Sequence, residues 1–356
     1  MKSKLRALTN LLIGKDELSY SIYNDSDRIN ETVEKYNHLL ELRASGSDGL
    51  KVTHISETVI SPLPFYGVKD KDKFDIVCVN LTPDYNKHRI HMEKQSAGEN
   101  WKNYFDFYTS HKVFDFISEE HSSYFMNMTK LFYAMYKPHE LAEISIENME
   151  KNLSVEKQEL FKKVIEDKSI LFAHLVPFHS EGFDSNINGI NHLRENMPSY
   201  DQYLTELLDY MKENIEDQGI IMSNGFADSK VLDQLLRSSG GEVVLENQLL
   251  TIQKWHNKWA ILFNDQPFTR FGLRSDLEID TVMKHIVDQI KNSPSDFNGL
   301  KDYCQLLLTE RQEDEFKARG QRIKGSSLKK MSVKNLRKNA INKKEVVVEE
   351  EPTENS

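Results

Sequence analysis

Hydrophobic residues along the chain form four short continuous runs, and between the runs they recur every three or four positions. Continuous runs of strand length are typical of strands buried on both faces, as in a parallel sheet covered by helices. The runs span 74–81, 170–178, 219–223 and 259–263. The helical spacing spans 29–43, 198–214, 228–237 and, after a capping-box pattern at 275–278, also 279–290. This alternation of strands and helices predicts an α/β fold.

The lengths between these elements predict how the chain is organised. We expect a three-layer α/β/α domain over 71–310 with a small, mostly parallel central sheet, preceded by a helical lead-in over 1–70. Residues 86–168 are too many for a simple crossover and are rich in aromatic rings, which predicts a mainly helical insertion. One extra strand is expected over 243–253. Apolar content falls in 311–356, which predicts a disordered tail.

Composition excludes several classes of protein. The 356 residues are 38% hydrophobic and 29% charged, as in a soluble globular protein. No run approaches the roughly 18 apolar residues of a membrane helix, and the stretch 8–13 is too short for a signal-peptide core. Two cysteines, Cys78 and Cys304, cannot form a disulfide framework or a Cys-rich zinc site. We therefore expect a cytoplasmic protein with no membrane partner.

Charge is strongly segregated along the chain. The formal net charge is −10, yet 317–344 carries eleven Lys and Arg and no Asp or Glu, and 345–356 carries five Glu and no Lys or Arg. The first 316 residues therefore have a net charge of about −16, beside a basic arm (317–344) of about +11. Such an arm neutralises phosphates without reading base sequence. The arm therefore predicts binding to nucleic acid. The alternatives are a solvated tail or a docking segment for an acidic protein.

Polar side chains and aromatic rings follow all four apolar runs. In open α/β sheets, ligands bind beyond the carboxyl ends of the strands, because the connecting loops diverge there. A flat polar ligand such as a nucleobase needs rings for stacking and hydrogen-bonding groups for its edge. The polar candidates are Asn80, Asp84, His179, Asn224 and Asn264, and the aromatic candidates are Tyr85, Phe178, Phe226 and Phe268. The alternative is that these residues only form turns and core.

Three segments resemble the strand series of the uracil-DNA glycosylase superfamily. They are Phe74-Asp75-Ile76-Val77-Cys78-Val79-Asn80-Leu81-Thr82-Pro83, Ile170-Leu171-Phe172-Ala173-His174-Leu175-Val176-Pro177-Phe178 and Gly219-Ile220-Ile221-Met222-Ser223-Asn224-Gly225. The resemblance covers 70–292, with 86–168 only loosely matched. It implies a small parallel sheet between helices and hydrolysis of the N-glycosidic bond of a base flipped out of DNA. It also implies that no metal and no organic cofactor take part.

Both motifs of this resemblance depart from the family pattern. Carried over by position, the first is Leu81-Thr82-Pro83-Asp84, in which Thr82 stands where the family usually has Asp, Asn, Glu or Ala. The second is Gln266-Pro267-Phe268, which lacks the histidine that stabilises the departing base. Excision of another base or of a modified base, or a loss of catalysis, is compatible with both departures.

The chemistry of the expected reaction assigns roles to the candidates. Cleavage develops positive charge on the sugar and negative charge on the leaving base. Asp84 is expected to place or activate water, with Asn80 orienting it. Donors to the base are expected from His179, Asn224, Asn264 and Arg270, and stacking rings from Tyr85, Phe178, Phe226 and Phe268.

We therefore expect a DNA glycosylase-like hydrolase that binds DNA or another nucleic acid. The alternatives are a non-catalytic nucleic-acid or protein-binding module on the same fold, and hydrolysis of a small nucleotide or nucleoside. The tail also offers a site for a protein partner. The DNA contacts are assigned to Arg270, Arg274, Lys324, Lys329, Lys330, Arg337 and Lys338.

Overall fold

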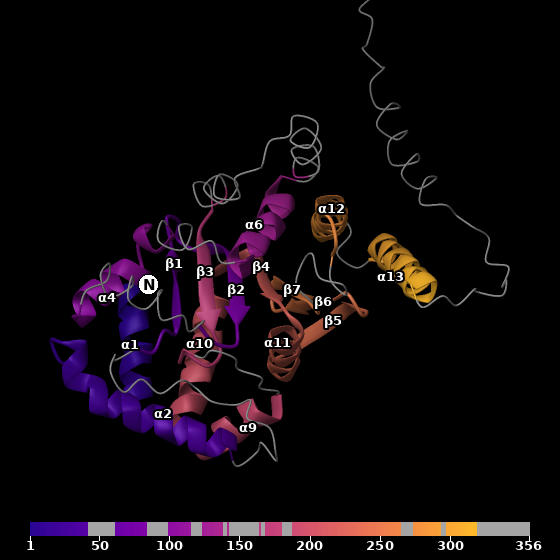
Figure 1. Ribbon diagram of the computed structural model, residues 1–356. Coiled ribbons are helices and arrows are strands. Elements are labelled where there is room, and N and C mark those ends of the chain that lie inside the picture. Colours follow the sequence, from indigo (N-terminus) through magenta and orange to yellow (C-terminus); the bar gives the residue numbers. More distant parts are fainter. Residues whose placement is uncertain are drawn as a thin grey trace, which may run out of the picture. The chain divides into compact units, whose positions relative to one another are not determined.

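The structure is a computed structural model, and it describes residues 1–41, 61–83, 99–114, 123–137, 141, 164, 168–179, 187–264, 273–292 and 297–318. Met1–Gln305 form one compact unit and Leu306–Ser356 form a second. The first unit is mixed α/β and contains all the strands named below (Figure 1). In the second unit, the structure describes only 306–318, the end of helix α13 (Asn298–Ala318).

Seven strands form one sheet in the order β1-β3-β2-β4-β7-β6-β5. The four apolar runs form its parallel strands, which confirms that prediction. They are β2 (Phe74–Asn80), β3 (Ile170–His174), β4 (Ile215–Asn224) and β7 (Lys258–Phe263). β3, β2, β4 and β7 pair in parallel in that order. Every position of β3 and β7 is buried, which explains why these runs do not alternate.

Antiparallel strands extend this parallel block on both sides, so the sheet is larger and more mixed than expected. On one side, β1 (Phe65–Val68) pairs with β3, within the span expected to be a helical lead-in. The two strands approach so closely at Gly67 that a Cβ there would lie 2.2 Å from the Ile170 carbonyl oxygen. The sequence does not predict this four-residue strand, because Pro62 and Pro64 just before it indicate an extended connection.

On the other side, β5 (Gly241–Glu246) and β6 (Leu250–Trp255) form a hairpin that pairs with β7. The single strand expected over 243–253 is therefore wrong. Asn247 reverses the chain, because its Oδ1 accepts hydrogen bonds from the backbone N–H groups two and three residues later, at 2.8 and 3.1 Å. This Asx turn lies inside an apolar stretch, where a sequence pattern does not reveal it.

The helices expected from three-to-four spacing are present. They are α2 (Ser26–Glu41), α10 (Pro198–Asn214), α11 (Phe226–Ser238) and α12 (Asp276–Asn292). The capping box of α12 also forms: the Ser275 hydroxyl accepts from the Glu278 N–H at 3.2 Å, and the Glu278 carboxylate accepts from the Arg274 N–H at 2.7 Å. In the expected helical insertion, the described helices are α4 (Trp101–Tyr108) and α6 (Ser123–Tyr136). The others are α1 (Lys2–Ile13), the 3-10 helix η1 (Ile22–Asp25) and α9 (Ile187–Asn196).

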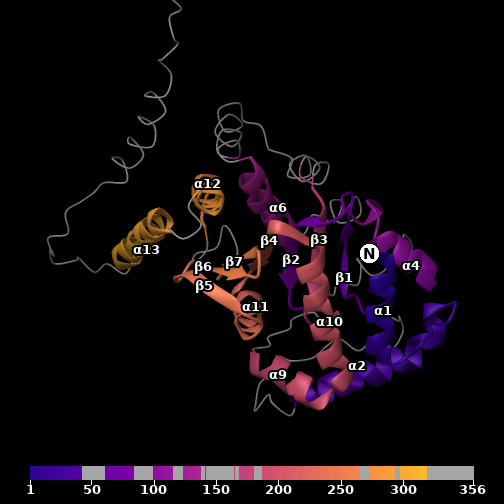
Figure 2. The ribbon, with the colours of Figure 1, turned by 180° about the vertical axis from the view of Figure 1, so that it is seen from behind.

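Aromatic rings join the helices to the sheet. Phe65 and Tyr66 are neighbours in β1, so their side chains point to opposite faces. Phe65 stacks on Tyr210 of α10 with ring centroids 5.2 Å apart, and Tyr66 stacks on Phe172 of β3 at 4.9 Å. Phe172 also meets Phe132 of α6 at 6.1 Å. α10 and α6 thus contact side chains from different faces, and α6 lies beside α12 (Figures 1 and 2).

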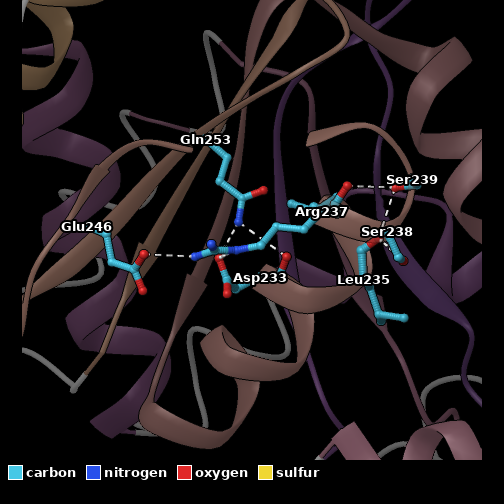
Figure 3. A network of polar contacts seen from close by, with 8 residues as sticks. Asp233, Leu235, Arg237, Ser238, Ser239, Glu246 and Gln253 are labelled. Atoms are coloured by element: carbon cyan, nitrogen blue, oxygen red, sulfur yellow. Dashed lines mark hydrogen bonds and ion pairs between the residues drawn. The ribbon is translucent and has the colours of Figure 1, made fainter. Parts of the chain in front are cut away.

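A polar network ties the β5–β6 hairpin to α11 (Figure 3). Asp233 of α11 accepts hydrogen bonds from Arg237 at 2.9 Å and from the amide of Gln253, a fully buried residue of β6. Arg237 also donates to Glu246 of β5 at 3.1 Å. Both strands of the hairpin are therefore held by a single turn of α11.

Asp233→Ala is expected to lower the free energy of unfolding by about 1 kcal/mol, because the buried Gln253 amide then keeps only its 3.2 Å bond to the Asp233 carbonyl. Arg237→Gln is the matched control. Its ion pairs are partly exposed, so it should cost less than about 0.5 kcal/mol. Urea denaturation of both variants measures the difference, and equal losses would contradict this account.

Candidate functional site

The parallel strands β2 and β4 are neighbours in the sheet, and the strands that follow them in the chain lie on opposite sides of this pair. The chain leaves β2 toward β3 on one side, and it leaves β4 toward β7 on the other. Ligands of open α/β sheets bind at such a switch point. The candidate site is the carboxyl edge of β3, β2 and β4, which we call the switch edge.

Three neighbouring strands end in polar residues at the switch edge. Asn80 pairs with His174 in the parallel register of β2 and β3. Cys78 and Met222 are the last pair of β2 and β4, and Asn80 and Asn224 each follow two residues later, at the ends of these strands. Adjacent strands are about 4.8 Å apart, so the three backbone positions span about 10 Å. The fold thus brings together Asn80 and Asn224, two residues expected from the sequence, and adds His174.

The loops beyond β2 and β3 stay paired after the strands end. The N–H groups of the two residues after β3 donate to the carbonyl oxygens of Asn80 and Leu81, at 2.9 and 2.7 Å. Pro177 follows and has no N–H to donate, so the pairing stops there. The apolar run continues through these paired loop residues and predicts a strand as far as Phe178, whereas β3 itself ends at His174.

His174 is a residue of this edge that sequence reasoning missed. Its side chain is 2% exposed, and its Nδ1 lies 2.8 Å from the Leu63 carbonyl oxygen. Its backbone N–H donates to the Pro64 carbonyl at 2.9 Å, and its carbonyl accepts from the Tyr203 hydroxyl of α10. The available signal was one polar side chain inside the apolar run 170–178, upstream of the expected strand end.

Phe178 and His179 are buried in the loop after β3. The Phe178 ring is 2% exposed and meets the Tyr36 ring of α2 edge-on, with centroids 4.8 Å apart. Tyr36 in turn meets Tyr200 of α10 at 5.4 Å, and the Tyr200 hydroxyl donates to the Leu175 carbonyl at 3.1 Å. His179 is 4% exposed. In this structure Phe178 therefore belongs to the core between α2 and α10 and offers no open stacking surface.

Tyr36→Phe is expected to leave the free energy of unfolding unchanged or to raise it by up to about 1 kcal/mol. The Tyr36 hydroxyl is fully buried and has no hydrogen-bond partner within the described part of the chain, so the variant removes an unpaired group and keeps the ring contacts. Tyr200→Phe is the matched control and should cost about 1 kcal/mol, because its hydroxyl is paired. Urea denaturation distinguishes them. A clear loss from Tyr36→Phe would instead indicate a buried water at that hydroxyl.

Asn264 and Arg274 have structural roles in the described part of the chain. Asn264 follows β7, but its amide Nδ2 donates to the Asn247 carbonyl at 2.8 Å and its N–H donates to the Leu249 carbonyl at 2.9 Å. It therefore closes the β5–β6 hairpin. The backbone N–H of Arg274 is part of the capping box of α12, through Glu278.

Ser223 of β4 places a buried hydroxyl beside the switch edge. It precedes Asn224, its side chain is fully buried, and its Oγ has no hydrogen-bond partner among the residues that the structure describes. A buried unpaired hydroxyl costs about 1–3 kcal/mol, so such a group calls for an explanation. After Asn224 the chain turns at Gly225, whose φ is 127°. Helix α11 then begins at Phe226, one of the aromatic residues expected at the site.

Several expected site residues lie outside the residues that the structure describes: Asp84, Tyr85, Phe268, Arg270, Lys324, Lys329, Lys330, Arg337 and Lys338. Of the tail expected to be disordered, 311–318 instead form the end of α13, and 319–356 lie outside the described residues. Within the described ranges, no three His, Cys, Asp or Glu residues gather to hold a metal ion. Among the helices of those ranges, none has the length and apolar character needed to cross a membrane.

The switch edge carries neutral groups that both donate and accept hydrogen bonds. The Asn80 amide offers two N–H donors and one carbonyl acceptor, and a neutral imidazole offers one donor and one acceptor. Groups of this kind can hydrogen-bond to the polar edge of a planar ligand or orient a water molecule. Searches of protein-family models, curated proteins and solved structures found no significant match to this chain.

Proposed function

We propose that the protein is a DNA glycosylase-like hydrolase, which cuts the N-glycosidic bond of a normal or modified base flipped out of DNA. The observation that carries this proposal is that β2, β3 and β4 end at the switch edge in Asn80, His174 and Asn224, of which Asn80 and His174 pair. The α10 and α6 contacts with different faces of the sheet support the three-layer fold that the resemblance implies.

The chemistry of the switch edge suits this reaction. The leaving base gains negative charge, which hydrogen-bond donors in a water-poor site stabilise. Asn80 and Asn224 are proposed to supply these donors, and Asp84 is proposed to hold the attacking water near the sugar. Extruding a base costs a few kcal/mol, which contacts with the DNA backbone must offset. We propose that the basic arm makes those contacts and that the protein acts in the cytoplasm.

Two observations favour a second candidate, a non-catalytic nucleic-acid-binding module on the same fold. Phe178 and Asn264, both expected at the site, are engaged in the core and in the hairpin. Thr82 also replaces the acid or amide of the first motif. A protein that binds a flipped base without cutting it needs the amides of the switch edge but no group that activates water.

A base-release assay separates the two candidates. The protein is incubated with single- and double-stranded DNAs that carry uracil, unmodified or modified bases, and mass spectrometry detects free base and abasic sites. Release from at least one substrate, lost in Asn80→Ala, supports the hydrolase. Salt-sensitive DNA binding with no release from any substrate overturns the hydrolase in favour of the binding module.

Removal of residues 319–356 is expected to weaken DNA binding and to flatten its dependence on salt. Each phosphate contact with duplex DNA contributes about −0.9 to the slope of log affinity against log salt concentration. Removal of 345–356 alone, which carries five Glu and no Lys or Arg, is the matched control and should not flatten the slope. Fluorescence anisotropy between about 50 and 200 mM salt measures both slopes. An unchanged slope for the longer deletion would refute the role of the arm.

A further inference from the structure

We propose that the turn from β4 into α11 binds a terminal phosphate, that is, a phosphate monoester such as the 5′-phosphate of a nucleotide. Ser223 and Asn224 end β4, Gly225 follows, and α11 begins at Phe226. The proposal does not depend on the glycosylase function. It rests on two independent observations, which are the uncapped first turn of a 13-residue helix and a buried hydroxyl that faces this helix.

The first turn of α11 offers backbone N–H groups to a ligand. The leading N–H groups of an α-helix have no carbonyl partner within the helix, and they lie at the positive end of the helix dipole. Gly225 precedes the helix and supplies no side-chain cap. A Cβ at Gly225 would meet no atom of the described residues within 4 Å, so these residues leave the space beside the turn open. Phosphate groups bind at helix N-termini of this kind.

The register of the sheet shows that the Ser223 side chain points toward α11. Gln253 of β6 donates to Asp233 of α11, so its side chain lies on the α11 face of the sheet. Gln253 pairs with Ala260 of β7, and Ala260 pairs with Ile221 of β4. Paired residues point to the same face, as do residues two apart in one strand, so Ser223 also lies on the α11 face.

The first turn of α11 is fixed close to this hydroxyl. The Phe263 carbonyl of β7 accepts hydrogen bonds from the Ser229 hydroxyl at 2.6 Å and from the Gly225 N–H at 3.1 Å. Phe263 directly follows Leu262, the register partner of Ser223. The Ser223 hydroxyl is fully buried and has no partner in the part of the chain that the structure describes. A phosphate oxygen held by the first turn supplies the acceptor that this hydroxyl lacks, which removes the cost of leaving it unpaired.

The burial of Ser223 favours a terminal phosphate over a phosphate within a DNA strand. A phosphodiester carries a sugar on two of its oxygens, whereas a monoester presents three free acceptor oxygens. The monoester therefore fits better at a turn whose hydroxyl is fully enclosed. Two sources offer this chemistry, a nucleoside 5′-monophosphate and the 5′-phosphorylated end of a DNA strand. Asp228 adds a negative charge to the first turn, which limits the affinity for an anion.

Isothermal titration calorimetry with the full chain tests the proposal. The probes are inorganic phosphate, deoxyuridine 5′-monophosphate and deoxyuridine, at about 150 mM salt to weaken non-specific binding to the basic arm. We expect both phosphates to bind and deoxyuridine not to bind. One oligonucleotide with and without a 5′-phosphate tests the second source, and tighter binding of the phosphorylated form also supports the proposal. No binding of phosphate or nucleotide, together with equal binding of the two oligonucleotides, overturns it.

Variants of β4 and α11 test the residues. Ser223→Ala is expected to weaken phosphate binding about tenfold, because a hydrogen bond to a charged group is lost. Its urea midpoint without phosphate should not fall, since the hydroxyl is unpaired in the described structure. Ser238→Ala is the matched control and should keep the wild-type affinity, because its hydroxyl donates to the Leu235 carbonyl at the other end of α11. Asp228→Asn should strengthen binding about threefold, because it removes a like charge.

Three results would contradict this account. Equal phosphate affinity in Ser223→Ala and wild type overturns the proposal. A tenfold loss of affinity accompanied by a lower urea midpoint overturns it as well, because the hydroxyl would then be structural. Weaker phosphate binding by Asp228→Asn would show that the anion does not lie at this turn.

Discussion

Asp25→Ala should cost about 3 kcal/mol of the free energy of unfolding, the largest stability loss that we expect from a single polar side chain here. The Asp25 carboxylate is fully buried at the end of η1. It accepts hydrogen bonds from the Lys15 ammonium, from the N–H (2.9 Å) and hydroxyl (2.6 Å) of Ser19, and from the Trp101 indole at 2.8 Å. Removing it takes the carboxylate away from the Trp101 indole N–H and from the Lys15 ammonium, which still donates to the Ser19 hydroxyl at 3.3 Å.

This carboxylate also joins two parts of the fold that are distant in sequence. Trp101 begins α4, whereas Lys15 and Ser19 lie between α1 and η1. Ile22 continues the contact, because its N–H donates to the Glu99 carbonyl at 3.0 Å. Glu31→Ala, which removes an exposed ion pair with Arg28, is the control and should cost less than about 0.5 kcal/mol. A similar cost for both variants in urea denaturation would contradict the account.

The Asp25 contribution should also depend on pH. Burial alone raises the pKa of the Asp25 carboxyl, but the hydrogen bonds from Lys15, Ser19 and Trp101 outweigh it, so the pKa in the folded protein is lowered. A carboxyl with a lowered folded pKa stabilises the protein above its unfolded pKa of about 3.9, and that stability is lost as the pH falls below it. The gap in unfolding free energy between wild type and Asp25→Asn should therefore narrow as the pH falls through about 4.

Elements with strong local signals could be predicted from the sequence. The helix 198–214 has Pro198 in its first turn and a regular apolar stripe, and the structure has the same bounds. The four buried strands follow from apolar content alone. β1 could not be predicted in this way, because its four residues are ordered by pairing with β3 and by the close approach at Gly67. Such contacts join residues about a hundred positions apart and leave no local pattern.

The candidate site also contains some residues that could be predicted from the sequence and others that could not. Asn80 and Asn224 could be found because each ends a recognisable strand. His174 could not, because pairing of the loops beyond β2 and β3 makes the apolar run longer than the strand. Asn264 occupies a similar sequence position after β7, yet its partner is a hairpin turn that the sequence did not reveal. Which polar side chain reaches a ligand therefore depends on tertiary hydrogen bonds, and sequence position narrows the choice without deciding it.

Asn80→Ala is expected to slow base release about 100-fold, the effect of removing one donor from a preorganised site. Asn264→Ala is expected to leave the release rate within about threefold and to lower the free energy of unfolding by about 1 kcal/mol, since it removes the bond to Asn247. Single-turnover release and urea denaturation measure the two effects on the same preparations.

The pair of variants separates two accounts of the carboxyl edge. Asn80 lies level with His174 across β2 and β3, whereas the amide of Asn264 is engaged in closing the β5–β6 hairpin. A loss of release in Asn264→Ala with unchanged stability would move the site toward β7 and the motif Gln266-Pro267-Phe268. A loss in Asn80→Ala with unchanged stability would instead place the chemistry at the switch point between β2 and β4, because only a group that acts on the ligand lowers the rate without affecting unfolding.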